Sequence, residues 1–327
     1  MCFKDKNVLV AGASGFTGTN LVKRLLEEGA NVRGTLHNQA PQEIFVSENK
    51  YTHDRLDYVR GDLTDRRFCT QSVEGMDYVF MCAANTSGAS VMENEPLAHV
   101  TPNVLMNTLM LEASHKAGVK KFLFMSSTTV YPIAEHALKE DDVTDEFFDK
   151  YYCVGWMKRF SEIMCEMYST KIKNPMTTII VRPGNLYGDY DDYEWDTSHS
   201  TAALIRRVVE RHDPLIVWGD GSDLKDITYI SDLIDGMILA MEQIEEFDIV
   251  NIASGKSYSI KETLDIILEA DGYLDATVEY DTTKPTMIPK RLIDITKAEC
   301  LLGFTPKIDL KSGIEKSIKH YKDSLKD

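Results

Sequence analysis

Short apolar runs alternate with amphipathic runs along the first half of the chain. Residues 6–12 (KNVLVAG) form an apolar, β-branched run of the kind found in strands that are buried on both faces. Apolar residues then recur at helical spacing, and Gly29 follows them where a helix would end. The apolar positions of this predicted helix are Leu21, Val22, Leu25 and Leu26.

Five more strands are predicted from similar runs, and their order indicates the fold class. They cover residues 30–36, 56–63, 76–84, 120–127 and 177–185. A helical pattern over residues 103–117 separates the fourth strand from the fifth. Strands that alternate with helices favour an α/β fold, in which a Rossmann-like, doubly wound parallel sheet has helices on both faces.

A glycine-rich turn lies between the first strand and the first helix. Gly12, Gly15 and Gly18 give the spacing GxxGxxG. Glycines so placed permit a tight turn, close approach of the backbone to a pyrophosphate and close packing of the helix, whose free N–H groups attract phosphate. We therefore predict a dinucleotide site at this turn. Its predicted contacts here are Gly12, Ser14, Gly15, Phe16, Thr17 and Gly18.

The end of the second strand bears on which dinucleotide binds. NAD sites usually place an acid there for the ribose 2′-hydroxyl, but residues 35–38 are Thr-Leu-His-Asn. Arg33 and His37 could instead meet a 2′-phosphate, so NADP is favoured over NAD. Asp62 ends the third strand, where it could touch the adenine or cap the next helix. The remaining predicted cofactor contacts are Leu63, Ala83 and Ala84.

The pattern loosens after Gly188, which suggests a second part of the molecule. The later segments are an acidic, aromatic loop over 189–200, a helix over 201–211, strands within 214–233 expected to return to the sheet, and an amphipathic helix over 259–272. We predict that a dinucleotide-binding domain covers residues 1–185 and regains residues 225–255. A smaller C-terminal substrate-binding lobe then contains residues 186–224 and 256–327.

Composition narrows the functional classes. The 327 residues are 43% hydrophobic and 27% charged, as in globular proteins, and no apolar run approaches the roughly 20 residues of a membrane span. The chain runs directly into a strand, so no signal peptide is predicted. Six cysteines without CxxC spacing predict reduced thiols in the cytoplasm and no metal site. A net charge of −16 argues against nucleic-acid binding but permits a local basic pocket for a small anion.

Longer motifs extend over almost the whole chain. The glycine turn is followed in order by SSTTVYP (126–132), RPGNLYG (182–188) and WGDGSDLKDITYISDL (218–233). In this order the motifs resemble the extended short-chain dehydrogenase/reductase family of nucleotide-sugar epimerases and dehydratases. The stretches FLFMSSTTVYP, MKRFSEIMCEMYS and PKRLIDITK are most similar to its GDP-fucose synthase branch. The resemblance implies an enzyme that acts at C4 of a nucleotide-diphosphate sugar, with GDP the favoured nucleotide, and it implies a homodimer.

The resemblance also implies roles for individual residues. Ser127 corresponds to the residue that hydrogen-bonds the sugar hydroxyl being oxidised, and Thr128 and Thr129 follow it. The fucose synthases carry a cysteine where this chain has Thr129, and a threonine hydroxyl is far less acidic than a thiol, whose ordinary pKa is about 8.5. His199 corresponds to their proton donor. Substrate contacts are implied for Asn185 and, at the diphosphate, for Arg207, Lys225, Lys284 and Arg291.

One catalytic group of the family is missing. The family places a tyrosine four residues before the lysine that binds the nicotinamide ribose, but Lys158 is preceded at that distance by Val154. On a regular helix Tyr152 lies about 120° away from the Lys158 face, and Tyr151 lies too far along the axis.

Three interpretations follow from the missing tyrosine. The chain could be an enzyme that uses another acid or base, such as His199, Tyr152 or water. It could be an enzyme that only transfers protons, or a non-catalytic sensor of NADP or a nucleotide sugar. The retained matches favour an enzyme. These are Ser127, Lys158, His199 and Arg207.

Overall fold

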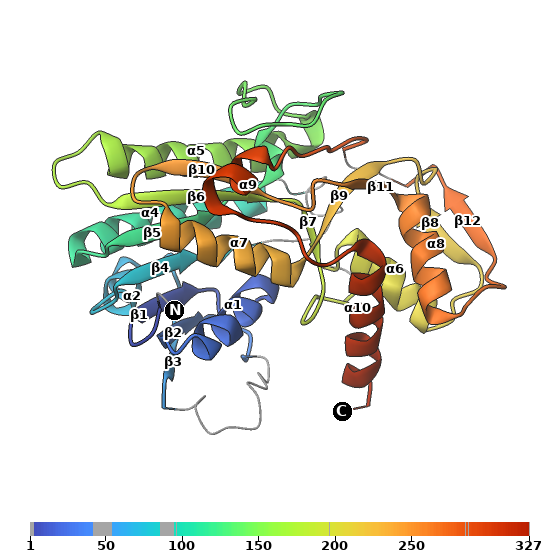
Figure 1. Ribbon diagram of the computed structural model, residues 1–327, viewed down its shortest axis with the longest axis horizontal. Helices are drawn as coiled ribbons and strands as arrows, with labels where there is room; N and C mark the ends of the chain where they lie inside the picture. Colours follow the sequence, from blue (N-terminus) through green and yellow to red (C-terminus); the bar gives the residue numbers. More distant parts are fainter. Residues whose placement is uncertain are drawn as a thin grey trace.

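A seven-stranded parallel sheet forms the larger part of the molecule (Figure 1). The computed structural model describes residues 3–41, 54–85, 95, 97–195, 197–284, 286 and 288–326. The strand order is β10-β6-β5-β4-β1-β2-β3, and each pairing is parallel. The strands are β1 (Asn7–Ala11), β2 (Asn31–Leu36), β3 (Leu56–Arg60), β4 (Tyr78–Met81), β5 (Lys121–Met125), β6 (Thr177–Pro183) and β10 (Asp248–Ile252). The predicted doubly wound α/β fold is confirmed.

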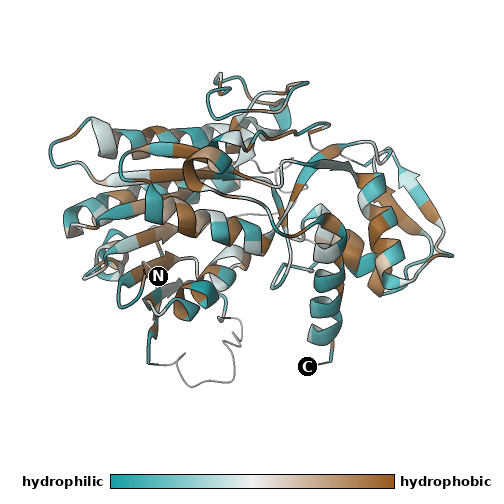
Figure 2. Cartoon of the chain, viewed as in Figure 1, coloured by the Kyte–Doolittle hydropathy of each residue, from teal (hydrophilic) through white to brown (hydrophobic). Residues whose placement is uncertain are grey.

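Helices cover both faces of this sheet. α1 (Phe16–Glu27) packs against α7 (Ile230–Gln243) on one face, and α2 (Arg66–Ser72), α4 (Leu97–Ala117) and α5 (Tyr152–Thr170) share the other face. The central strands are therefore buried on both sides and mostly apolar (Figure 2). α4 begins before its predicted start at residue 103 and contains Pro102. In the part of the chain that the structure describes, no helix has the length and apolarity to cross a membrane.

Two small sheets and three helices form most of the remaining structure. β7 (Asn185–Tyr187), β9 (Leu224–Tyr229) and β11 (Ser257–Ser259) form a sheet in the order β11-β9-β7, and β8 (Leu215–Trp218) pairs with β12 (Val278–Asp281). The helices beside them are α6 (Ser200–Val209), α8 (Ile260–Asp271) and α10 (Leu310–Ser324). α8 contacts both α6 and α10, whereas α9 (Thr296–Leu302) lies against α7 and β10.

The strands within residues 214–233 do not return to the large sheet as expected. Side chains of β8 alternate between buried and more exposed positions, so this strand has one wet face and suits a small outer sheet. β9 is buried, but its partners are β7 and β11. It is α7 and β10 that rejoin the large sheet, where β10 pairs with β6.

A buried polar network joins α5 to the sheet. The carboxylate of Glu162 accepts hydrogen bonds from Nε and Nη2 of Arg182 (2.8 and 2.7 Å) and from Oγ of Ser126 (2.6 Å). Glu162 and Arg182 have side chains that are 0% and 1% exposed. Arg182 also donates to the hydroxyl of Tyr131, which donates to Asn251 on β10. The network therefore connects α5, β6 and β10 through side chains.

Candidate active site

The three glycines of the turn have different structural tasks. Gly12 has a φ of +82°, and a Cβ there would lie 2.7 Å from Cα of Ala83. A Cβ on Gly18 would lie only 2.0 Å from the carbonyl oxygen of Gly12. At Gly15 the nearest atom to such a Cβ is 3.5 Å away, so space is left there. Gly12 and Gly18 thus allow the turn to fold, whereas Gly15 leaves the start of α1 open.

Two threonines hold the turn, and neither was predicted from the sequence. The backbone N–H of Gly12 donates to Oγ1 of Thr35 on β2 (3.0 Å), and Oγ1 of Thr19 donates to the carbonyl of Ala13 (3.2 Å). The Gly15 N-cap has no side chain to occupy the first N–H groups of α1, and its first turn carries no acid. These features fit a dinucleotide pyrophosphate, because free helix N–H groups attract phosphate.

The other residues predicted in the turn lie around the start of α1. Thr17 is buried, Phe16 packs against the core beneath the helix, and Ser14 is half-buried. Ala84 follows β4 and is also half-buried, close in sequence to the Ala83 that touches Gly12. Leu63 is buried in the core, so only its backbone is available to a ligand.

Arg33 does not lie where a 2′-phosphate was expected. Its Nη1 donates to the carbonyls of Ser72 and Glu74 (3.1 and 3.0 Å), and its Nε lies 3.6 Å from the carboxylate of Asp57. Arg33 lines a hollow that is also lined by Asn7, the first residue of β1, so this hollow lies at the amino ends of the strands. The long side chain of Arg33 therefore leads away from the end of β2 at which the glycine turn is held.

His37 and Asp62 lie together at the carboxyl ends of β2 and β3. The N–H of Thr64 donates to the Asp62 carboxylate (2.8 Å) and lowers its pKa, and nearby His37 adds to this effect. The N-cap of α2 is Asp65, not Asp62, because Asp65 accepts the N–H of Arg67. Asp62 thus remains beside the expected adenosine position without serving as the helix cap.

Ser127 and its neighbours form a short helical turn after β5. Ser127 is the N-cap of η1 (Thr128–Val130), where its Oγ accepts the N–H of Thr129 (3.1 Å). Thr128 is buried. Oγ1 of Thr129 is also buried and has no hydrogen-bond partner within the described residues. A buried hydroxyl without a partner is costly, so this atom is suited to a ligand contact.

Lys158 reaches the same end of β5. Its Nζ donates to the carbonyl of Met125 (2.9 Å), two residues before Ser127, and lies 5.1 Å from the centre of the Phe124 ring. Burial lowers the pKa of Lys158 to about 8, while Glu162 and Cys82 oppose the shift. α5 and β5 therefore bring the predicted lysine and serine to one place.

The two tyrosines at the start of α5 lie in different surroundings. Tyr152 is 55% exposed and packs edge-on against Phe147 and Trp156, so it does not face Lys158. Tyr151 belongs to η2 (Asp149–Tyr151), and burial raises its pKa to about 12, an effect that Arg291 opposes. The chain enters α5 through this 3-10 turn, and Tyr151 lies close enough to Arg291 to feel its charge.

Lys225 and Arg291 form a buried basic pair. Arg291 is 2% exposed and donates from Nη1 to the carbonyl of Pro132 (2.9 Å). Burial lowers the pKa of Arg291 to about 10. Lys225 donates to the carbonyl of Ile288, lies 3.5 Å from the Asp223 carboxylate and has a pKa that burial lowers. Two cations beside one carboxylate leave net positive charge in this region.

Arg207 is a second candidate for binding phosphate. It is half-buried on α6, with its guanidinium carbon 5.1 Å from the centre of the Trp195 ring. Burial lowers its pKa, and it forms no ion pair with any residue that the structure describes. A partly desolvated guanidinium that lacks a carboxylate can bind two oxygens of a diphosphate.

The remaining predicted residues are not joined to this group by any described contact. His199 is the N-cap of α6 and is exposed, with Asp192 close enough to act on its charge. Lys284 is exposed, 5.9 Å from the centre of the Trp218 ring. Asn185 is half-buried at the start of β7.

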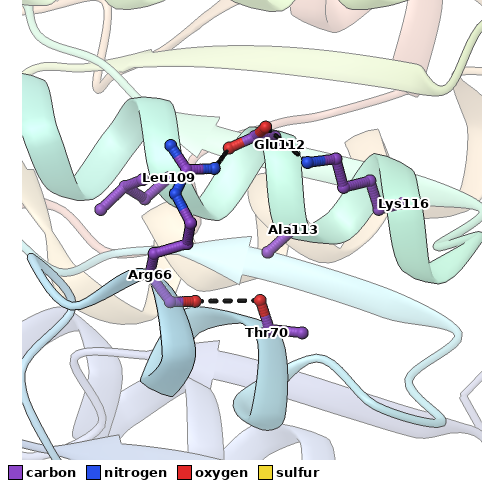
Figure 3. A pocket seen from close by; sticks show the side chains of 6 residues that line it. All are labelled: Arg66, Thr70, Leu109, Glu112, Ala113 and Lys116. Carbon is purple, nitrogen blue, oxygen red and sulfur yellow. Dashed lines mark hydrogen bonds and ion pairs between the residues drawn. The ribbon is translucent and has the colours of Figure 1, made fainter.

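A small hollow between α2 and α4 is a poor alternative site (Figure 3). Its charged side chains already bind one another, because Arg66 and Lys116 both pair with Glu112. Thr70 donates to the carbonyl of Arg66 within its own helix (2.9 Å). The hollow therefore offers a ligand few free polar groups.

Comparison with known proteins agrees with this arrangement. Residues 8–253 match the NAD dependent epimerase/dehydratase family. The chain is 28% identical to GDP-L-fucose synthase 1 of Arabidopsis thaliana over 98% of this chain and 94% of that protein. It is 24% identical to GDP-L-fucose synthase of Escherichia coli (strain K12) over 94% of each. UDP-glucuronic acid 4-epimerase from Bacillus cereus, solved with UDP-glucuronic acid and NAD, has a TM-score of 0.83 and 25% identity, covering 97% of this chain and 99% of that one.

Proposed function

Because the chain belongs to the NAD dependent epimerase/dehydratase family, we propose that it is an NADP- or NAD-dependent enzyme acting at C4 of a nucleoside-diphosphate sugar. The observation that carries this proposal is that Lys158 binds the Met125 carbonyl at the end of β5, two residues before Ser127, where the buried Thr129 hydroxyl has no hydrogen-bond partner among the described residues. GDP is the favoured nucleotide, since relatives named GDP-L-fucose synthase match nearly the whole chain.

The dinucleotide would be held along the ends of β1, β2 and β4. The open position at Gly15 and the free N–H groups of α1 suit its pyrophosphate, and Lys158 suits the nicotinamide ribose. When bound, the nicotinamide supplies or accepts a hydride. We propose that residues 1–185 and 225–255 make this half of the site.

Ser127 is placed to act on the sugar. Its Oγ accepts the N–H of Thr129, so its own proton is left to donate to a sugar oxygen such as O4. Thr129 would add a second hydroxyl. Since a threonine hydroxyl is a weak acid, oxidation or reduction at C4 is favoured over epimerisation at the neighbouring carbons.

The diphosphate and the remaining proton are assigned to the lobe formed by residues 186–224 and 256–327, together with Asn185 and Lys225 at its borders. Arg207, which lacks an ion-pair partner within the described residues, suits the diphosphate, with Lys225 and Arg291 adding positive charge. Lys284 and Asn185 would contact the rest of the nucleotide sugar. His199, whose ordinary pKa is near 6.5, would move the proton that a tyrosine at position 154 would otherwise move.

The test is to mix the protein, loaded with NADP or NAD, with GDP-, UDP- and dTDP-sugars and follow absorbance near 340 nm. A change with one nucleotide class, lost in Ser127→Ala, is the expected result. Uptake of solvent deuterium into a 4-keto sugar without any absorbance change would indicate proton transfer alone. Calorimetry that detects neither dinucleotide binding nor nucleotide-sugar binding would overturn the proposal.

We also propose that two copies associate through α4 and α5. Tyr152, Trp156, Phe160 and Met167 recur at helical spacing on one side of α5 and are 55, 39, 42 and 44% exposed. α4 packs beside α5 and carries exposed Leu97 and Leu105. An exposed apolar stripe of this kind is typical of a helix–helix interface, and a second copy presents the same stripe.

Light scattering after size exclusion tests this association. The unchanged protein should have twice the molar mass of one copy. The double variant with Trp156→Glu and Phe160→Glu should have the molar mass of a single copy. A monomeric unchanged chain would contradict the proposal.

We place the enzyme in the cytoplasm, because each of the five cysteines that the structure describes is a free thiol.

A further inference from the structure

Arg60 lies at the end of β3, beside the turn that follows β2. Leu36, the last residue of β2, is paired in register with Arg60, the last residue of β3. Nη1 of Arg60 donates to the carbonyl of His37 and lies 3.4 Å from the carbonyl of Gln39. The guanidinium of this exposed residue therefore rests against the turn that follows β2.

This guanidinium retains unused donors. Within the described residues Arg60 forms no ion pair, and only its Nη1 makes a hydrogen bond. Three other arginines nearby are paired with carboxylates, whereas Arg67 on α2 has no ion pair among the described residues. These pairs are Arg33 with Asp57, Arg55 with Asp5, and Arg66 with Glu112. Asp62, the carboxylate beside His37, accepts the N–H of Thr64.

A ribose 2′-hydroxyl and a 2′-phosphate require opposite partners at this place. The hydroxyl is held by a carboxylate acceptor, and residues 35–38 supply none. A phosphate is held by the planar fork of an arginine, which binds two oxygens at once. We propose that Arg60, assisted by His37, binds the 2′-phosphate and makes the enzyme selective for NADP. This inference rests on the proposed dinucleotide site.

Calorimetry with adenosine 2′,5′-bisphosphate and with adenosine 5′-monophosphate isolates this contact, because the two compounds differ only in the 2′-phosphate. The unchanged protein should bind the bisphosphate roughly tenfold or more tightly than the monophosphate, which corresponds to one charge-assisted contact. In Arg60→Gln the ratio should fall close to one while affinity for the monophosphate is kept. Arg60→Lys, which keeps the charge without the fork, should give an intermediate ratio. Arg67→Gln, an exposed α2 arginine without an ion pair among the described residues, is the control and should keep the full ratio.

The outcomes separate this inference from the proposed function. Equal binding of both compounds to the unchanged protein overturns the role of Arg60 while the dinucleotide site stands. Equal loss of both in Arg60→Gln, with an unchanged melting temperature, shows that Arg60 only shapes the turn and also overturns it. Binding of neither compound to the unchanged protein refutes the dinucleotide site itself.

Discussion

At the scale of single residues, Lys158 has no phenol beside it whose pKa it could lower. A lysine beside a catalytic tyrosine lowers the phenol pKa, but Val154 offers no phenol at this position. What remains is the ammonium held by the Met125 carbonyl, close to Ser127. Its charge can therefore serve the bound dinucleotide and the sugar directly.

The lowered pKa of Lys158 gives a prediction about pH. The folded protein holds this pKa at about 8, below the ordinary value of 10.5, so the charge is lost as the pH rises through 8. We expect the affinity for NAD, which has no 2′-phosphate for His37 to contact, to be constant between pH 6 and 7.5 and to fall toward pH 9.5, by up to about tenfold per unit. Calorimetry across this range checks it. The Lys158→Met variant should bind the dinucleotide weakly, and its affinity should not fall with rising pH. Its free energy of unfolding should not decrease, because the substitution removes a buried cation. A flat profile for the unchanged protein would show that the ammonium does not contact the dinucleotide.

Restoring the absent phenol is a second prediction at this scale. Position 154 is half-buried on the first turns of α5, four residues before Lys158. If C4 oxidation is limited by a weak base, Val154→Tyr should raise kcat, by roughly 10²-fold or more for a positioned general base. Val154→Phe is the matched control and should leave kcat unchanged. An unaltered rate in Val154→Tyr would mean that another group, such as His199, already carries the proton.

At the scale of elements, the turn between β1 and α1 contains one glycine that folding requires and another that dinucleotide binding requires. A Cβ on Gly18 would lie 2.0 Å from the Gly12 carbonyl oxygen, whereas one on Gly15 meets nothing closer than 3.5 Å. Gly18→Ala should therefore cost about 3 kcal/mol or more of unfolding free energy. Gly15→Ala should unfold at nearly the same urea concentration as the unchanged chain but bind dinucleotide roughly tenfold more weakly, because its methyl group would stand before the phosphates. Urea titration and calorimetry on both variants check this, and equal stability of the two would contradict it.

The elements were easier to predict than their partners. Apolar, β-branched runs predict six strands of the large sheet, because most of these strands are buried on both faces, although the edge strand β3 is only partly buried. The pattern of β8 and β9 shows how each strand is buried but not which sheet it joins. Tyr152, the first residue of α5, lies off the Lys158 face as helical geometry predicts. Tyr151 was harder to place, because it belongs to the 3-10 turn before α5, where the helical geometry assumed for it does not hold. The guanidinium of Arg33 was expected at the wrong place, because a strand position fixes the direction of Cβ and not that of the end of a long side chain. The sequence also gave no indication that Thr35 would bind the backbone of the glycine turn.

At the scale of the whole molecule, the buried Glu162–Arg182 pair stabilises the packing of several elements at once. It connects α5, β6 and, through Tyr131 and Asn251, β10. Glu162→Gln would leave a buried guanidinium without its charge partner and should cost about 3–5 kcal/mol of unfolding free energy. Glu269→Gln removes a carboxylate from an exposed pair with Lys311 and should cost less than about 1 kcal/mol. Urea unfolding of the two variants measures the difference, and similar costs would show that the buried network is not strongly coupled.

The position of β10 in the sheet also matters during synthesis. Its partner β6 ends at Pro183, whereas β10 is complete only when Ile252 has been added. Between them in the sequence lie β7, α6, β8, β9 and α7. At roughly 5–20 residues per second, a ribosome leaves the apolar flank of β6 without its neighbour for several seconds. During that interval the nascent chain presents an unpaired strand edge to other chains. A message truncated before residue 248 would make that exposure permanent, so such fragments should aggregate or recruit chaperones even though they contain the whole glycine turn.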